Sequence, residues 1–222
     1  MSALSTRIAA LALPFALLTG LSAQASTNLL QNGSFEASST ASSQDGSYCY
    51  NNFPSNVECG TAVPSWTGTF VLIAADSGPW GTPQNLGNNA LIDGHVVAGI
   101  QGNSSLSQSV SLSAGSYTLS WVDTNRNGYD NQFYDVLLGS VTLGSFSTTV
   151  GDAWTTRSLT FTVGTSGLQT LTFAGLERGG IDGTSFIDNV QLTSAVPEPS
   201  DLALVLAGLA VVGSVARRRA AR

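Results

Sequence analysis

The sequence has no lysine, one histidine and two cysteines among its 222 residues. A Ser-His-Asp or Cys-His catalytic group needs an imidazole to carry the proton. His95, within Asp93-Gly94-His95, is the only imidazole, and it is better explained as a loop or strand-end residue. A zinc site needs three or four His, Cys or carboxylate ligands, and this pool is too small. Composition therefore argues against nucleophilic and zinc catalysis.

Basic residues are scarce away from the two ends of the chain. Residues 26–196 hold three arginines against twelve acids, a net charge of −9, whereas the whole chain carries −6. A surface this acidic repels phosphate backbones, so nucleic acid is not an expected partner. The negative electrostatic potential of such a surface does not oppose the binding of cations or neutral glycans. The acidity also fits an exported protein that merely stays soluble.

The first residues have the pattern of a secretory signal. Arg7 precedes an apolar stretch over Ile8–Leu21, and the small residues Ala23 and Ala25 flank Gln24 in an A-x-A pattern. This predicts a signal peptide over residues 1–25 with cleavage after Ala25. Residues 26–195 then remain for one folded domain, enough to bury a sizeable core.

The last residues combine a proline motif, an uncharged apolar run and an arginine cluster. These are Val196, Pro197, Glu198 and Pro199, then Leu202–Val215, then Arg217, Arg218 and Arg219. The order resembles the sorting segment of PEP-CTERM proteins, which exosortases of Gram-negative bacteria process. The apolar run rises only about 21 Å as a helix, against a hydrocarbon core of about 30 Å, so it predicts a weak membrane segment. An ordinary C-terminal anchor is the alternative.

This resemblance predicts a route and a partner. Residues 196–222 would form a transmembrane sorting helix that holds the protein briefly, with the arginines on the cytoplasmic side. An exosortase-like enzyme would then release the protein, exported across the inner membrane, to the cell surface or the exterior. In an exported chain the two cysteines, Cys49 and Cys59, are expected to form a disulfide worth about 2.5 kcal/mol.

Period-two alternation is the clearest structural signal. Apolar residues alternate with polar ones over Leu106–Leu112 and again over Tyr117–Trp121, on both sides of a turn at Ala114-Gly115. We expect these two stretches to pair as antiparallel strands with one buried face. Further strands are expected at Asn28–Glu36, Ser65–Ala74, Phe133–Leu138, Val141–Phe146, Thr155–Val163, Leu168–Ala174 and Phe186–Leu192. No helical period appears between the two ends. The pattern predicts an all-β fold, a two-sheet antiparallel sandwich.

Several short motifs resemble those of galactose-binding-like jelly rolls related to carbohydrate-binding modules. They are Asn28–Glu36, Trp66, Gln101, Leu106–Gln108, Ala114–Leu119, Arg126 and Phe186–Val190. The resemblance implies a jelly roll. Members of such folds bind sugars, bind calcium structurally or do unrelated things, so the fold alone does not give the function.

The resemblance also implies a structural calcium site. In related modules a carboxylate of the first strand and one of the last share the ion, and Glu36 and Asp188 stand at those places. Two ordinary surface acids are the alternative. The run from Asp123 to Tyr129 imitates the opening of an EF-hand loop, but Tyr134 occupies the position that should be acidic. We therefore interpret that run as a strand connection.

Sugar binding needs an exposed aromatic face with hydrogen-bonding groups nearby. Trp80, on a loop rich in glycine and proline, and Tyr129, beside Arg126, are the candidates for ligand binding. Trp80 fits a cap over the sandwich equally well. Trp66, Trp121 and Trp154 fit core positions better.

The sequence thus favours a non-catalytic exported protein of the cell surface or extracellular matrix, associated with exopolysaccharide. A glycan-binding module with a defined sugar ligand is the first alternative. The second is a jelly-roll enzyme, a glycosidase or cyclase, which would need two carboxylates facing one cleft. Glu36, Glu58 and Glu177 lie far apart in the sequence and mark no such pair.

Overall fold

The computed structural model describes residues 27–37, 48–52, 58–59, 63–74, 77, 80, 90–178, 182–195 and 199–220. They belong to two units, one within Ser26–Val196 and one that includes Pro197–Arg222. The predicted signal peptide over residues 1–25 lies outside the described residues. The elements are β1 (Tyr48–Asn51), β2 (Phe70–Ala74), β3 (Val96–Gln101), β4 (Ser105–Leu112), β5 (Gly115–Asn125), β6 (Gln132–Leu138), β7 (Val141–Thr148), β8 (Thr155–Val163), β9 (Gly167–Leu176), β10 (Thr184–Ser194) and α1 (Pro199–Ala220).

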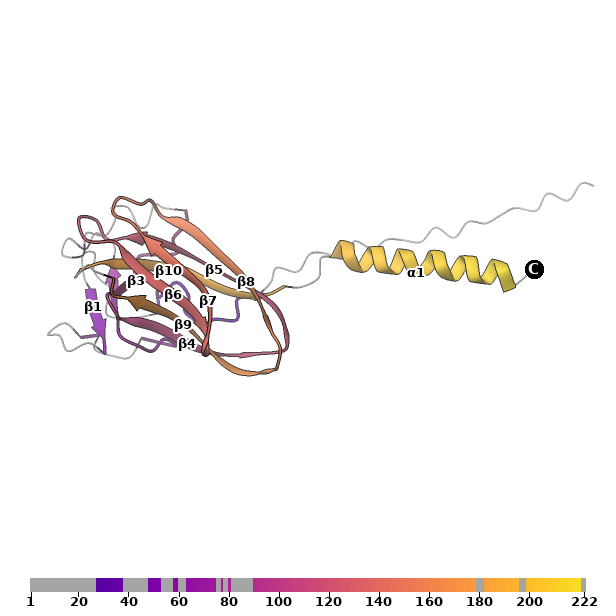
Figure 1. Ribbon diagram of the computed structural model, residues 1–222, viewed down its shortest axis with the longest axis horizontal. Coiled ribbons are helices and arrows are strands. Elements are labelled where there is room, and N and C mark those ends of the chain that lie inside the picture. Colours follow the sequence, from indigo (N-terminus) through magenta and orange to yellow (C-terminus); the bar gives the residue numbers. More distant parts are fainter. Residues whose placement is uncertain are drawn as a thin grey trace, which may run out of the picture. The chain divides into compact units, whose positions relative to one another are not determined.

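The strands of the described residues form two antiparallel sheets, as the alternating patterns predict (Figure 1). The larger sheet has the order β1-β2-β3-β10-β5-β8, and the smaller one has the order β4-β9-β6-β7. The two-sheet antiparallel sandwich is therefore confirmed. The sequence also predicted no helix between the two ends, and the described residues of Ser26–Val196 contain no α-helix, since α1 belongs to the other unit.

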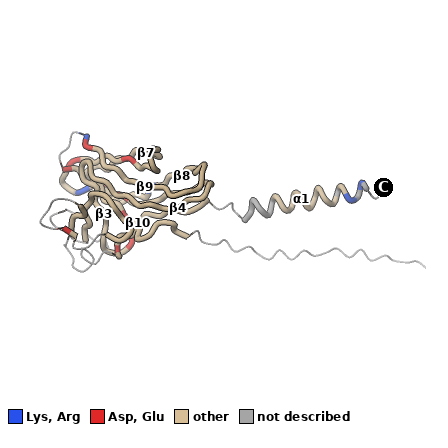
Figure 2. Tube along the Cα trace, turned by 90° about the horizontal axis from the view of Figure 1, so that it is seen from below, with Lys and Arg blue, Asp and Glu red and all other residues tan. Residues whose placement is uncertain are grey.

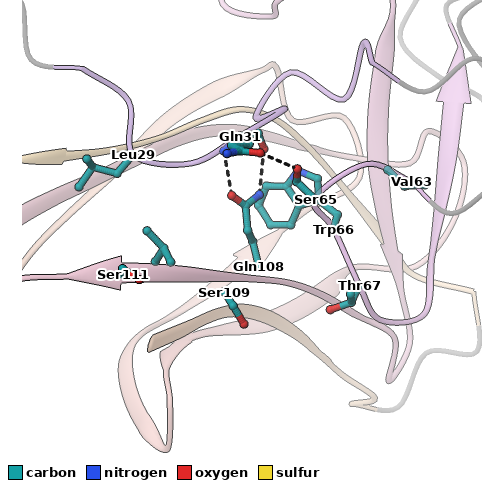
Figure 3. Close-up of a pocket in the computed structure, with 10 residues that line it drawn as sticks. Leu29, Gln31, Val63, Ser65, Trp66, Thr67, Gln108, Ser109 and Ser111 are labelled. Atoms are coloured by element: carbon teal, nitrogen blue, oxygen red, sulfur yellow. Dashed lines mark hydrogen bonds between the residues drawn. The ribbon is translucent and has the colours of Figure 1, made fainter. Parts of the chain in front are cut away.

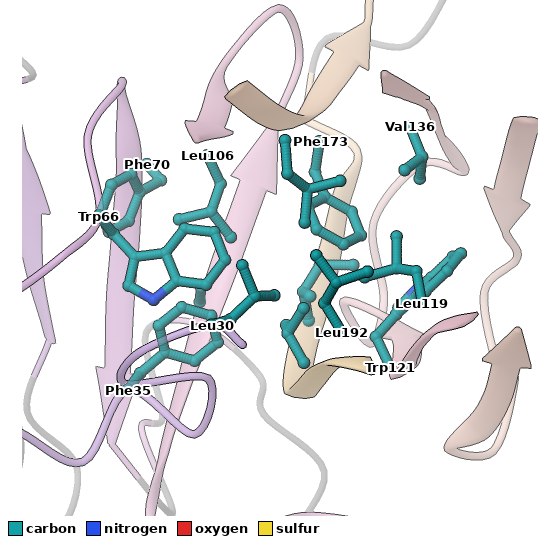
Figure 4. Packing of buried hydrophobic residues seen from close by; sticks show 14 of the residues in the cluster. Leu30, Phe35, Trp66, Phe70, Leu106, Leu119, Trp121, Val136, Phe173 and Leu192 are labelled. Carbon is teal, nitrogen blue, oxygen red and sulfur yellow. The ribbon is translucent and has the colours of Figure 1, made fainter. Parts of the chain in front are cut away.

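The predicted pairing between residues 106–112 and 117–121 is wrong, although both strands exist. β4 pairs with β9 in the smaller sheet, while β5 pairs with β8 and β10 in the larger one. Leu106 of β4 and Leu119 of β5 are both fully buried and enter the same core from opposite sheets (Figure 4). Alternation identifies the buried face of a strand but not its hydrogen-bonded neighbour.

The predicted strand over Asn28–Glu36 is absent, and turns take its place. The segment still runs beside β10. The N–H of Leu29 donates to the carbonyl of Leu192 at 2.8 Å, and the N–H of Val190 donates to the carbonyl of Gly33 at 2.9 Å. These two main-chain hydrogen bonds, and two more made by the side-chain amide of Asn28, fix this segment against β10.

Two buried clusters cover the two faces of the larger sheet. The main core lies between the sheets and includes Trp66, Trp121 and Phe173 (Figure 4). The second cluster lies on the outer face and is formed by Val71, Ile73, Trp80, Val97, Val122, Trp154 and Phe186. Along β2 and β3, successive side chains belong alternately to the main core and to the outer cluster, so these strands are buried on both faces. Such strands appear as continuous apolar runs without alternation. The strand predicted over Ser65–Ala74 accordingly begins only at Phe70.

The predicted disulfide is confirmed. Cys49 of β1 bonds to Cys59, with Cα atoms 4.8 Å apart. The N–H of Cys59 also donates to the carbonyl of Tyr50 at 2.9 Å. By constraining the unfolded chain, this short covalent loop contributes about 2.5 kcal/mol to the free energy of unfolding. It also anchors β1, an edge strand of the larger sheet.

Helix α1 contains Pro199 as its first residue, the apolar run and the arginine cluster, while Val196, Pro197 and Glu198 lie outside the described residues. Large apolar side chains along it, from Val205 to Val212, are exposed. In the described part of the chain no helix is long and apolar enough to cross a membrane. Of the sorting helix predicted over residues 196–222, the structure shows a helix over Pro199–Ala220.

Candidate functional site

Asp188 lies within β10, and its side chain is fully buried. Its Oδ2 accepts a hydrogen bond from the N–H of Asp93 at 2.8 Å, whereas Oδ1 has no hydrogen-bond partner among the described residues. Burial raises the pKa of Asp188 to about 8, and the charges of Asp93 and Glu36 act in the same direction. A buried charge requires a counter-charge and hydrogen bonds. An ionised Asp188 would therefore need a further partner beyond the N–H of Asp93.

Glu36 binds the same turn as Asp188. Its Oε1 accepts hydrogen bonds from the N–H groups of His95 at 2.7 Å and Val96 at 2.6 Å. Gly94 has a φ of 86°, and a Cβ at this position would overlap the carboxyl group of Glu36. The two residues predicted to share a calcium ion thus both accept hydrogen bonds from N–H groups of residues 93–96, a turn that the sequence had marked only as a loop or strand end.

Unusual backbone conformations accompany both carboxylates. Phe35, directly before Glu36, has a φ of 61°, and Asn189, directly after Asp188, has a φ of 50°. The register of β10 also shifts between Asp188 and Gln191. A bulky residue in the left-handed region persists only where its surroundings hold it, and such residues gather at functional sites. A bulge next to a site re-aims a side chain.

This pair fits a hard cation in part. Two carboxylates supply oxygen atoms of the kind that Ca²⁺ prefers, and Oδ1 of Asp188 is a ligand atom without another partner in the described structure. Calcium takes about six to eight oxygen ligands, so main-chain carbonyls would have to supply most of them. Among the described residues, no group of three or more His, Cys, Asp or Glu side chains could hold a metal ion.

The three residues predicted to bind a ligand form one stack. The guanidinium carbon of Arg126 lies 4.5 Å from the ring centroid of Trp80 and 3.5 Å from that of Tyr129. Nη1 of Arg126 forms an ion pair with Oδ1 of Asp182 at 2.9 Å, and the amide of Gln101 also donates to this oxygen. Residues far apart in the sequence therefore converge on one guanidinium group.

Only one end of this stack meets solvent. Trp80 is 2% exposed and packs edge-on against Tyr48 and Tyr50, with centroids 5.9 and 5.8 Å away. It belongs to the outer cluster of the larger sheet and caps that face, one of the two placements expected for it. Tyr129 is 39% exposed. The ring of Tyr129, not that of Trp80, is available for stacking on a ligand.

Asp123, the first residue of the EF-hand-like run, is not available as a metal ligand. It lies in β5 with its side chain fully buried, and Arg157 donates to both its oxygens, at 2.9 and 3.1 Å. The hydroxyl of Tyr134 donates to Oδ2 at 2.6 Å, and Nε1 of Trp121 donates to that hydroxyl at 2.9 Å. Burial raises the pKa of Asp123, and the hydrogen bonds from Tyr134 and Arg157 oppose this rise.

A groove of about 640 Å³, which sequence reasoning missed, lies beside β4 (Figure 3). The segment Leu29–Gln31 forms one wall, Ser109–Ser111 form the other, and Trp66 also lines the groove. Its lining contains no charged residue. The alternating serines of β4 were the only signal in the sequence, and they did not show that residues 29–31 lie opposite.

Charged residues are distributed unevenly over the sandwich. Figure 2 shows that they lie mainly around the loops at one end of the strands. β4 and β9 carry no charged residue along their whole length. The groove beside β4 therefore lies along an edge strand without charged residues.

No family model matches the sequence, and no curated protein matches it. Among solved structures the chain is similar to the Stig cyclase FisC from Fischerella sp. TAU, with 18% identity and a TM-score of 0.50 over 77% of this chain and 98% of that one. TmCBM61 in complex with β-1,4-galactotriose matches at 17% identity and a TM-score of 0.44 over 76% and 99%. The carbohydrate-binding module CBM36 in complex with calcium and xylotriose matches at 24% and 0.38 over 47% and 84%. The likeness to FisC shows a shared fold, and the two TM-scores below 0.5 carry no argument about this chain.

Proposed function

We propose that this chain is an exported, non-catalytic protein whose β-sandwich binds a glycan at Tyr129. The observation that carries the proposal is the stack around Arg126. The guanidinium group holds the ring of Tyr129 from one side, and the ring is exposed. Asp182, with its side chain 39% exposed, adds a hydrogen-bond acceptor on the same guanidinium group. A fixed aromatic face beside a carboxylate is a suitable surface for a sugar ring.

Tyr129→Ala is expected to weaken glycan binding by about two- to tenfold, because a ring that stacks on a ligand contributes roughly 0.5 to 1.5 kcal/mol. Tyr129→Phe keeps the ring and should retain most of the affinity. Leu168→Ala, an exposed apolar residue of β9, is the matched control. Binding is measured by calorimetry after a glycan array in calcium has identified a ligand, with β-1,4-galactotriose and xylotriose among the probes.

Trp80→Ala would not test this proposal, since Trp80 is buried and its removal would disturb the outer cluster of the larger sheet. A glycan array without any signal would contradict the proposal. Equal affinity of the wild type and Tyr129→Ala, with unchanged melting temperatures, would place the ligand elsewhere on the sandwich.

We further propose that Glu36 and Asp188 hold a structural calcium ion, with main-chain carbonyls as the other ligands. The buried Oδ1 of Asp188 without a partner in the described residues supports this. When bound, the ion would supply positive charge to carboxyl groups that otherwise repel each other. Glu36 and Asp188 would then tie residues 27–37 to β10 through the turn at residues 93–96.

We propose that residues 196–222 act as a sorting signal for an exosortase-like enzyme. In the organism that encodes the chain, the mature exported protein is then expected to lack Leu202–Arg222, as intact-mass spectrometry would show. A variant with Pro197→Ala and Pro199→Ala should keep these residues, because the extended backbone that proline imposes is lost. Ser194→Ala, just before the motif, is the control. Wild-type protein that retains Leu202–Arg222 would contradict this proposal.

A further inference from the structure

β4 is an edge strand of the smaller sheet, and a neighbouring segment covers the first half of its free edge. The N–H of Ser105 donates to the carbonyl of Thr69 at 2.8 Å. Ser107 and Thr67 exchange two main-chain hydrogen bonds, at 2.8 and 2.9 Å. The chain before β2 thus already adds a short strand to β4 along its outer side.

Among the described residues, no segment pairs with the second half of this edge. In an antiparallel ladder the main-chain groups of alternate residues point to opposite sides. Those of Ser107 point away from β9, so those of Ser109 and Ser111 do as well. The register agrees, because the carbonyl of Thr170, opposite Ser109, accepts its hydrogen bond from Gly139 on the far side of β9. In the described part of the chain, no hydrogen bond satisfies the main-chain groups of Ser109 and Ser111 on the open side.

Ser109 and Ser111, which carry these open groups, both line the groove beside β4 (Figure 3). The opposite wall is fixed. The N–H of Leu29 binds β10, and the N–H and carbonyl of Gln31 both bind the side-chain amide of Gln108, at 2.8 and 2.9 Å. Because this wall stands across from the edge, a single extended chain can enter, whereas a second copy of the sheet would meet the wall.

The chemistry of the groove favours a polypeptide over a sugar. Trp66 is 2% exposed, so it offers no ring for stacking. Donors and acceptors of Ser109 and Ser111 repeat at about 6.6 Å, the two-residue repeat of an extended main chain. Natural edge strands usually block such addition with charges or proline, and β4 has neither. No charged side chain lines the groove, so a charged segment would gain no partner.

We propose that the groove binds one extended, uncharged polypeptide segment, which adds a strand to β4 at Ser109–Ser111. Recognition comes from main-chain hydrogen bonds that continue the ladder begun by Thr67, as in other cases of β-strand addition. Leu29, which is 38% exposed, supplies apolar surface for side chains of the bound segment. This proposal is independent of the glycan site at Tyr129.

The test uses the full chain and a capped hexapeptide of alternating threonine and valine as the probe. NMR titration should shift the amide signals of Ser109 and Ser111. Ser109→Pro removes an outward N–H without breaking the sheet, since proline is tolerated at edges where that N–H faces solvent. It should weaken binding by roughly tenfold, the effect of one or two main-chain hydrogen bonds. Ser109→Ala keeps the main chain and should stay within about twofold of the wild type.

A second measurement covers the case in which Ser109→Pro fails to fold. Two probe peptides, N-methylated at odd or at even positions, are compared on the wild type, and only the one with methyl groups toward β4 should lose binding. The proposal is overturned if millimolar peptide leaves both amide signals unchanged, or if a folded Ser109→Pro binds equally well. It is also overturned if β-1,4-galactotriose shifts these signals and the peptide does not. A dimer that Ser109→Pro abolishes would equally overturn it in favour of a second copy.

Discussion

Arg157→Met is expected to lower the free energy of unfolding at pH 7 by about 3 to 5 kcal/mol, the usual effect of removing one partner of a buried ion pair. For a domain of this size the melting temperature should fall by about 10 °C. Arg157 binds both oxygens of Asp123, whose side chain is fully buried. Methionine keeps apolar volume but donates no hydrogen bond, so only the hydroxyl of Tyr134 would remain on this carboxylate.

The loss should be smaller at pH 4 than at pH 7. Burial already raises the pKa of Asp123, and removing Arg157 takes away a hydrogen bond that opposes this rise. A carboxyl group whose folded pKa lies above its unfolded value of about 3.9 favours folding in its protonated form. Its contribution is fully present below the unfolded pKa and is lost as the pH rises through the folded pKa. Urea denaturation at both pH values measures the difference.

Arg178→Met is the matched control for Arg157→Met. The guanidinium carbon of Arg178 lies 5.4 Å from the ring centroid of Phe133, the side chain is exposed, and within the described residues it forms no ion pair. Its replacement should cost less than about 1 kcal/mol. The double variant Asp123→Asn/Arg157→Met should recover part of the loss, since no buried charge remains. If Arg157→Met costs no more than Arg178→Met, the ion pair does not contribute to stability.

The bounds of strands with one solvent-exposed face could be predicted closely from the sequence. β8 was expected over Thr155–Val163 and has these bounds, because its side chains alternate between the core and solvent. β3 was missed, since Val96–Ile100 is buried on both faces and shows no alternation. The partner of β4 could not be predicted either. The alternating pattern shows only that Leu106 and Leu119 point into a core. Two strands give this same alternation whether they pair in one sheet or face each other across the core.

The candidate calcium pair came from positional resemblance, and the structure brings Glu36 and Asp188 to one turn. What the sequence did not show is that the loop at Asp93-Gly94-His95 binds both carboxylates. It acts through main-chain N–H groups at residues 93, 95 and 96, and these have no side-chain signature. The orphan Oδ1 of Asp188 was equally hidden, because burial of a carboxylate depends on all the elements packed around it.

The sequence predicted the three residues of the stack, Trp80, Arg126 and Tyr129, only as separate candidates for ligand binding. Proximity in sequence suggested Arg126 with Tyr129, whereas Trp80 reaches the guanidinium group through the arrangement of the larger sheet. The opposing walls of the groove beside β4 meet for the same reason. Leu29–Gln31 and Ser109–Ser111 are brought together by hydrogen bonds to β10 and Gln108, which involve main-chain atoms.

Millimolar calcium is expected to raise the melting temperature by about 5 to 10 °C at pH 8.5 and by less at pH 6. An ion that binds only the folded state at a hundredfold excess over Kd adds about 2.7 kcal/mol. For a domain of this size that corresponds to the stated shift. Calorimetric scans in calcium and in chelator at both pH values provide the measurement.

The pH dependence follows from Asp188. Burial raises its folded-state pKa to about 8, above the unfolded value of about 3.9. Without calcium, the stability that Asp188 contributes is therefore fully present below about pH 4 and is lost as the pH rises through 8. Calcium binds the ionised carboxylate. At pH 6 it must displace a proton from Asp188, whereas at pH 8.5 most of that proton has already left, so the calcium effect grows with pH.

Asp188→Asn separates the ion from the carboxyl group. The amide is neutral at every pH, so in chelator at pH 8.5 this variant should be at least as stable as the wild type, and calcium should not change its melting temperature. Asp135→Asn, in β6 of the other sheet and bonded to Ser145, should keep the full calcium response. Identical melting curves of the wild type in calcium and in chelator at both pH values would instead make Asp188 a buried neutral acid. Its Oδ1 would then stay unpaired, and only the bond from Asp93 would hold the side chain to the turn.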